Sequence, residues 1–145
     1  INKKIHTLSE EENISEKGIK VLNEIGIAFA HSEVDDESIF IERLKNQSKK
    51  FLNAGSWKIL LESEGLTENL NKENFRWNII DKIISPLKLS EFMVEADDQD
   101  VLCKYIEIYG PNINMMIDYT RLLKMEDARL GYGPSQFLWG KVVKY

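Results

Sequence analysis

The sequence predicts a mainly α fold, a single-domain helical bundle of about six helices around one hydrophobic core. Three observations predict it: apolar residues recur at helical spacing, glycine or proline follows most of these segments, and 145 residues suffice for one buried core. One or two short strands are expected at 27–30 and 136–145, and an α+β fold is the alternative. No linker rich in Ser, Gly or Pro divides the chain, so residues 1–145 are expected to form one domain.

Four helices are expected in the first 85 residues, at about 15–25, 36–55, 56–65 and 74–84. In the first, apolar residues recur every three positions before Gly26, which stands where a helix C′ glycine belongs. Asp35 or Asp36 can cap the second helix, and Ser56 can cap the third, "WKILLESEG". The fourth, "NFRWNIIDKII", has a wide apolar arc and ends at Ser85-Pro86, because the residue before a proline disfavours the helical region.

Two more helices are expected after residue 100. "VLCKYIEIYG" (101–110) has two adjacent columns of apolar residues, and Gly110-Pro111 ends it. "NINMMIDYTRLLKMEDARL" (112–130) places Ile113, Met116, Ile117 and Leu123 on one face. The tail "QFLWGKVVKY" lacks helical spacing and is rich in β-branched and aromatic residues, which favours a strand or an extended segment.

Composition and charge exclude several classes of protein. The longest apolar runs are far shorter than the roughly 20 residues of a membrane-spanning helix, so no membrane segment is expected. The single cysteine, Cys103, cannot form an internal disulfide, which favours a reducing compartment, and we expect a cytoplasmic protein. A net charge of −5 repels phosphate backbones, so nucleic acid is not an expected ligand.

Two acidic clusters are the most prominent local feature. "EVDDE" covers 33–37, and "EFMVEADDQD" covers 91–100 with five carboxylates and no Lys or Arg. Either Asp97, Asp98 or Asp100 can cap the helix that begins near Val101, but one cap does not explain five acids. The clusters therefore predict a docking surface for a basic protein partner. The expected partner-binding residues are Glu33, Asp35, Asp36, Glu37, Glu91, Glu95, Asp97, Asp98 and Asp100.

No arrangement in the sequence predicts catalysis, a metal centre or a cofactor. The acidic stretch lacks the glycine and the final glutamate of a calcium loop, and His31 has no second histidine at metal-binding spacing. Cys103 falls among core positions of a helix, where a thiol serves as a small apolar side chain. We therefore expect no catalytic residues, no metal and no cofactor.

Three classes of function remain. The first is a small acidic protein that neutralises a basic partner, such as an immunity protein or antitoxin that blocks a nuclease toxin domain by occlusion and charge complementarity. The second is a helical scaffold or regulatory subunit that binds through an apolar groove. The third is an enzyme that uses carboxylates with a metal. The sequence favours the first and predicts a protein that is not an enzyme, and it leaves the oligomeric state open.

Overall fold

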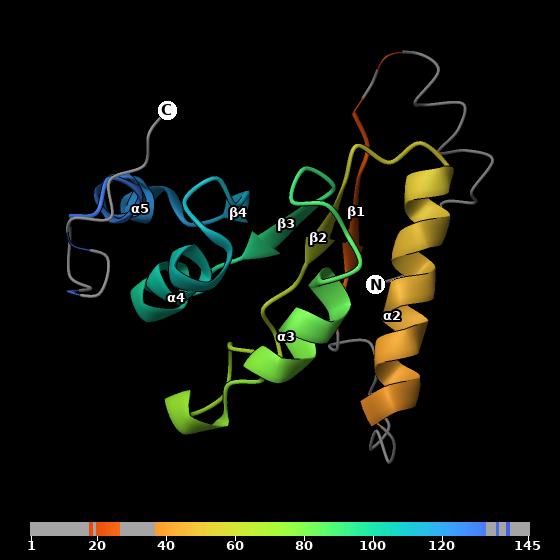
Figure 1. The fold of residues 1–145 in the computed structure, drawn as a ribbon, viewed down its shortest axis with the longest axis horizontal. Coiled ribbons are helices and arrows are strands. Elements are labelled where there is room, and N and C mark those ends of the chain that lie inside the picture. The colour runs from red at the N-terminus through yellow and green to blue at the C-terminus, as the bar shows by residue number, and fades with distance from the viewer. Residues whose placement is uncertain (1–17, 19, 27–36, 133–135, 137–138, 140–145) are drawn as a thin grey trace.

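The computed structural model describes residues 18, 20–26, 37–132, 136 and 139, which form an α/β fold around a four-stranded parallel sheet (Figure 1). The strands lie in the sequential order β1-β2-β3-β4, and each neighbouring pair is parallel. Their bounds are β1 Leu22–Ile25, β2 Lys58–Leu61, β3 Phe92–Glu95 and β4 Met115–Met116. The helices are α2 Glu37–Asn53, α3 Trp77–Ile84, α4 Gln99–Tyr109 and α5 Leu122–Arg129, with 3-10 helices η1 Lys72–Asn74 and η2 Tyr119–Arg121.

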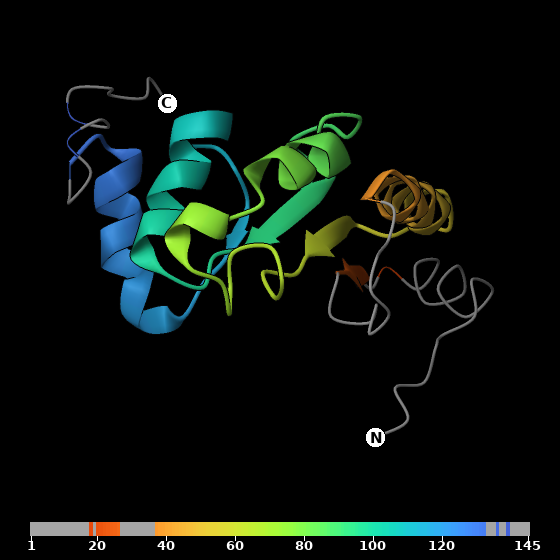
Figure 2. The ribbon, with the colours of Figure 1, turned by 90° about the horizontal axis from the view of Figure 1, so that it is seen from below.

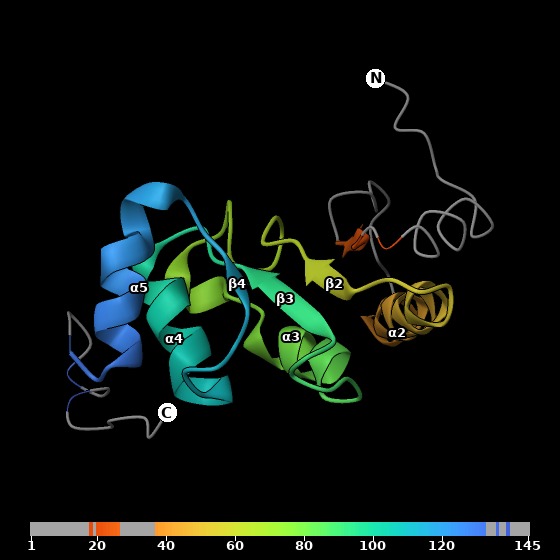
Figure 3. The ribbon, with the colours of Figure 1, turned by 90° about the horizontal axis from the view of Figure 1, so that it is seen from above.

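Helices α2, α3 and α4 lie on the same side of the sheet, and α5 packs beside α4 (Figures 2 and 3). Among the described residues, no helix covers the opposite side. Strands in unbroken sequential order with helices on one face have the winding of a β/α barrel, whereas a doubly wound sheet reverses its strand order and carries helices on both faces. The carboxyl ends of the four strands therefore meet at one edge of the sheet.

The core lies between the sheet and the helices. Alternate strand residues face the helices, among them Ile59 and Leu61 of β2 and Phe92 and Val94 of β3, all at most 3 % exposed. They pack in one cluster with residues from α2, α3 and α4, including Leu44, Ile80, Ile83, Leu102 and Tyr105.

The expected six-helix bundle is wrong, and so is the α+β alternative, because the strands are parallel and alternate with helices. Leu22–Ile25 forms β1 instead of the end of a helix, and Lys58–Leu61 forms β2 instead of a two-turn helix. Strand β3 falls inside the acidic stretch, where no strand was expected. The physical reason is that short parallel strands buried by helices read as continuous apolar runs, and four residues show no period that separates strand from helix.

Several local predictions are confirmed. Helix α2 lies where the second helix was expected, and α4 ends at Gly110, whose φ of 85° is easy only for glycine.

Other local predictions are wrong or lie outside the described residues. The segment 112–130 divides into β4, η2 and α5 instead of one helix. The possible strand at 27–30 and nearly all of the one at 136–145 lie outside the described residues. No described helix is long and apolar enough to cross a membrane, and the prediction of a single domain stays untested.

Candidate active site at the strand ends

The carboxyl ends of parallel strands are the place where β/α folds bind ligands, because the loops there vary freely while the strands fix their starting points. Strand β1 is followed by Gly26, β2 by Glu62 and Ser63, and β3 by Ala96 and Asp97. Carboxylates and a hydroxyl thus gather at the ends of β2 and β3, the two central strands of the described sheet.

Glu62 and Glu95 lie side by side on the face of the sheet that the helices do not cover. Leu61 pairs with Val94, so the next residues in register are Glu62 and Glu95. Leu61 and Val94 belong to the helix-facing core, and the side chains that follow them therefore project from the other face. One carboxylate oxygen of Glu62, Oε2, is buried. Two acidic side chains are thus held on rigid strand ends, close to each other.

Gly26 leaves the space that the Glu62 side chain occupies. A Cβ atom at residue 26 would stand 2.9 Å from Glu62 Cβ and closer still to its carboxylate, which is less than real Cβ contacts allow. Residue 26 is itself buried. The glycine at the end of β1 is therefore required by the close approach of a side chain from β2.

Ser63 positions Glu95. The Ser63 backbone N–H and hydroxyl both donate to Glu95 Oε2, each at 3.0 Å, and the hydroxyl also lies 2.9 Å from Glu68 Oε2. Ser63 is 1 % exposed, so these bonds form away from bulk water. Its carbonyl accepts the N–H groups of Leu66, Thr67 and Glu68, which fixes the turn that brings Glu68 back to the site. The carboxylate of Glu95 is held by donors that a folded loop preorganises.

The surroundings of Asp97 disfavour the negative charge of its carboxylate. The buried hydroxyl of Thr67 donates to Asp97 Oδ1 at 2.8 Å. Burial is the largest influence on this group and raises its pKa above the ordinary value, although the Thr67 hydrogen bond opposes the shift. The neighbouring charges of Asp98 and Glu68 raise the pKa further. Asp97 therefore takes up a proton more readily than a solvated aspartate does.

This set of groups suits proton transfer and the binding of a hard cation. Within the described residues, no group of three or more His, Cys, Asp or Glu side chains is close enough to hold a metal by itself. Mg²⁺ does not need such a group, because it is commonly bound through one or two carboxylates together with waters and substrate phosphates. Glu62 and Glu95 are the described residues that fit this mode.

The described acids among the residues expected to bind a partner have different surroundings. Glu33, Asp35 and Asp36 lie outside the described residues, and Glu37 forms an ion pair with Lys82 at 3.0 Å. Asp98 caps α4 by accepting the Val101 N–H at 2.8 Å and is thus the one of the three candidate aspartates that forms the cap.

The remaining members of the second acidic cluster are divided between the two ends of β3. Glu91 precedes β3 and accepts the Lys88 N–H at the far end of the strand from the site. The exposed Asp100 pairs with Lys72. Only Glu95 and Asp97 lie at the strand ends. A role of these acids in binding a partner stays a prediction.

Sequence reasoning missed Gly26, Glu62, Ser63, Thr67 and Glu68. The signal that would have found two of them is polar residues directly after a buried strand, in "KILLES", but this requires the strand to be recognised first. Cys103 is buried as predicted, and burial raises the pKa of its thiol, which favours the neutral form.

Comparison with known proteins gives the chemistry that these groups could serve. The sequence model of the (2R)-phospho-3-sulfolactate synthase (ComA) family matches residues 5–133. The chain is also similar to "Protein HEAT-STRESS-ASSOCIATED 32" of Arabidopsis thaliana, with 28 % identity over 89 residues. That alignment covers 61 % of this chain and 30 % of the relative, so the chain matches less than a third of the length of the plant protein.

The family match and the fold overturn three expectations. The protein was expected not to be an enzyme, whereas the matching family is an enzyme family. The predicted function as an immunity protein or antitoxin is wrong for the same reason. The alternative function as a helical scaffold is also wrong, because the fold is α/β. The whole described sheet lies inside the matched residues, including the ends of β1, β2 and β3. The chain belongs to the (2R)-phospho-3-sulfolactate synthase family.

Proposed function

We propose that the strand ends of this chain catalyse the formation of the carbon–sulfur bond of a phosphosulfolactate. The observation that carries the proposal is that the family match includes the strand ends where Glu62, Glu95 and Asp97 lie. The chain spans less than a third of the length of its plant relative, so the activity of the whole protein is also a proposal.

The product named by the family defines the reaction. It is a three-carbon acid with a phosphate ester on C2 and a sulfonate on C3. Its C3–S bond is formed without an oxidant or reductant when the sulfur lone pair of sulfite attacks C3 of phosphoenolpyruvate. The C2–C3 π electrons move toward the carboxylate, which becomes an enediolate. A proton delivered to C2 then returns these electrons to a C–H bond and completes the product.

The residues have distinct tasks in this scheme. Asp97 donates the proton to C2, because burial favours its protonated form and the site places it at the end of β3. Ser63 keeps Glu95 in position through two hydrogen bonds. Glu62 and Glu95 hold a divalent cation, which when bound offsets the negative charge of the substrate and of the developing enediolate.

The test is an assay of the protein with phosphoenolpyruvate, sulfite and Mg²⁺, in which ³¹P NMR follows the conversion of an enol phosphate into an alkyl phosphate. We expect Asp97→Asn to lower kcat on the order of 100-fold or more, because the amide cannot supply the proton. Glu91→Gln is the matched control, since Glu91 lies at the opposite end of β3, and it should keep parental activity. Absence of any alkyl phosphate with the parent protein, or equal rates for parent and Asp97→Asn, would overturn the proposal.

We also propose a cytosolic location for the protein. The support for it is the single buried thiol, which has no cysteine partner in this chain.

A further inference from the structure

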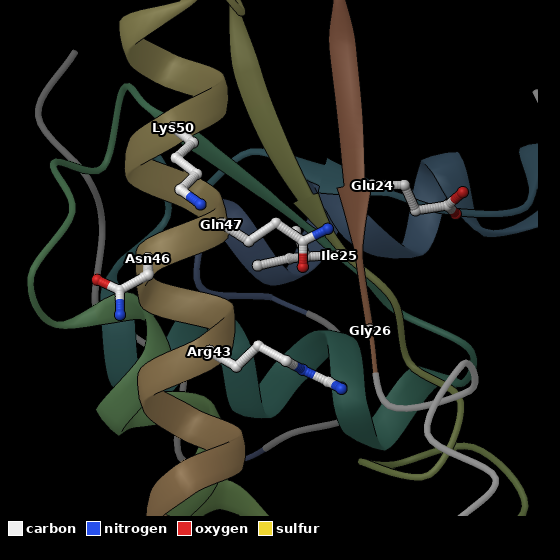
Figure 4. A pocket seen from close by; sticks show the side chains of 7 residues that line it. All are labelled: Glu24, Ile25, Gly26, Arg43, Asn46, Gln47 and Lys50. Carbon is white, nitrogen blue, oxygen red and sulfur yellow. The ribbon is translucent and has the colours of Figure 1, made fainter. Parts of the chain in front are cut away.

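A hollow of about 560 Å³ lies between helix α2 and the edge strand β1, which is within the size range of small-molecule pockets (Figure 4). Strand β1 contributes the residues from Glu24 to Gly26. The wall from α2 consists of Arg43, Asn46, Gln47 and Lys50. Because these four are spaced three, four and seven positions apart, they form one face of the helix.

The chemistry of this wall favours anions. Arg43 and Lys50 supply two positive charges, and the amide side chain of Gln47 between them supplies N–H donors. The carboxylate of Glu24 points away from α2, while Arg43 and Gln47 extend toward β1 and Lys50 lies along α2 (Figure 4). The hollow is therefore locally cationic in a chain whose net charge is −5.

The two cations of the hollow have no acidic partner among the described residues. Neither Arg43 nor Lys50 forms an ion pair there, and the guanidinium of Arg43 lies over the Phe40 ring, 5.4 Å from its centroid. Six other described cations do pair with nearby acids, in Lys45–Glu42, Lys72–Asp100, Lys82–Glu37, Lys88–Glu91, Lys104–Glu107 and Arg129–Glu126. Arg43 and Lys50 are therefore available to an anionic ligand.

The spacing of the cations indicates the shape of that ligand. Seven residues of helix separate the Cα atoms of Arg43 and Lys50 by about 10 Å. A single phosphate meets one of them well, whereas a small molecule with an anionic group at each end reaches both. Arginine binds a phosphate or carboxylate through two parallel hydrogen bonds, and lysine binds the second anion as a point charge.

We propose that this hollow is a binding site for a small phosphorylated carboxylate, separate from the proposed reaction site. The two sites meet at Gly26, since Glu62 packs against one side of this residue and the hollow lies on the side toward α2. Arg43 binds one anionic group, Lys50 binds the other, and the amide of Gln47 contacts the ligand between them.

The test is a titration of the ¹⁵N-labelled protein with 3-phosphoglycerate, followed by NMR. We expect the side-chain amide of Gln47 and the backbone amide of Gly26 to shift, and inorganic phosphate to bind more weakly. The double variant Arg43→Gln/Lys50→Gln should weaken the affinity for 3-phosphoglycerate roughly tenfold, because two charge-assisted contacts are lost. Glutamine keeps the helix propensity, so α2 should remain folded.

The control is Lys49→Gln/Lys124→Gln, which removes the same charge from exposed positions outside the hollow and should bind as the parent does. Asp97→Asn should also bind as the parent does, which separates this site from the proposed reaction site. An equal loss of affinity for 3-phosphoglycerate in both double variants would show that only the net charge matters, and it would overturn the proposed site. Shifts confined to the ends of β2 and β3 would place the ligand elsewhere and also overturn it.

Discussion

At the scale of single residues, the site contains two carboxylates in different surroundings. The Ser63 hydroxyl and N–H hold the Glu95 carboxylate in place by hydrogen bonds, whereas burial raises the pKa of Asp97 and so disfavours its charge. Two carboxylates near each other in such different surroundings are typical of sites that divide the roles of charge stabilisation and proton transfer. The arrangement costs stability, as functional sites commonly do.

The cost at Asp97 leads to a prediction about pH. The folded-state pKa lies above the ordinary value of 3.8, so the ionised carboxylate destabilises the fold above that folded-state pKa. The penalty declines as the pH falls through the folded-state pKa and is absent below 3.8, where the group is protonated in both states. Asp97→Asn keeps an acceptor for Thr67 but removes the charge. We expect it to melt at a higher temperature than the parent at neutral pH, with the difference shrinking toward about pH 4.

The measurement is a series of thermal melts across this pH range, followed by circular dichroism. Asp127→Asn serves as the control, because Asp127 is exposed and removal of its charge should give no comparable trend. A parent that is more stable than Asp97→Asn at neutral pH would contradict the prediction.

At the scale of elements, the acidic residues around α4 show how similar side chains differ in their effect. Asp98 caps the helix through the Val101 N–H, whereas Asp100 is exposed and pairs with Lys72 in solvent. The cap satisfies a backbone donor that has no partner within the helix. The exposed pair is screened by water and restricts two flexible side chains.

Asp98→Ala should therefore lower the free energy of unfolding by about 1 kcal/mol. Asp100→Ala should lower it by at most about 0.5–1 kcal/mol. Urea denaturation of the two variants measures both values under the same conditions. If Asp100→Ala proves the more damaging substitution, the assignment of the cap is wrong.

Helices and strands differed in how far the sequence predicted them. Long amphipathic segments such as α2 and α4 carry enough turns to show their period, and the two ends of α4 are marked by Asp98 and Gly110. Strand β2 shows only "KILL", with all four residues buried. Such a run fits a buried helix turn equally well, and only pairing with β1 and β3 makes it a strand.

At the scale of the whole molecule, the parallel sheet collects residues that are distant in the sequence. Glu62 and Glu95 become neighbours because β2 and β3 pair in register, and Thr67 reaches Asp97 across 30 positions. The helices that connect the strands bury the other face of the sheet. The stability of the site therefore depends on the core behind it.

The prediction at this scale concerns Ile80, which is fully buried in the shared core between α3 and the sheet. Ile80→Ala should lower the free energy of unfolding by about 2–5 kcal/mol, because it removes apolar burial and leaves a cavity. Ile39→Ala is the matched control at a position 69 % exposed on α2, and it should change stability by less than about 0.5 kcal/mol. Urea denaturation checks both, and equal losses would place Ile80 outside the core.

The sequence by itself determined the positions of α2 and α4, the presence of an aspartate cap at the start of α4, the buried state of Cys103 and the acidic character of the stretch around Glu95. These properties depend on local periodicity, backbone capping and composition, which are all present in a single segment. The tertiary structure alone decided that short apolar runs pair as parallel strands and that Glu62, Glu95 and Asp97 share one edge with Ser63 and Thr67. The reason is that strand pairing and the convergence of strand ends are contacts between distant segments, which no local pattern records.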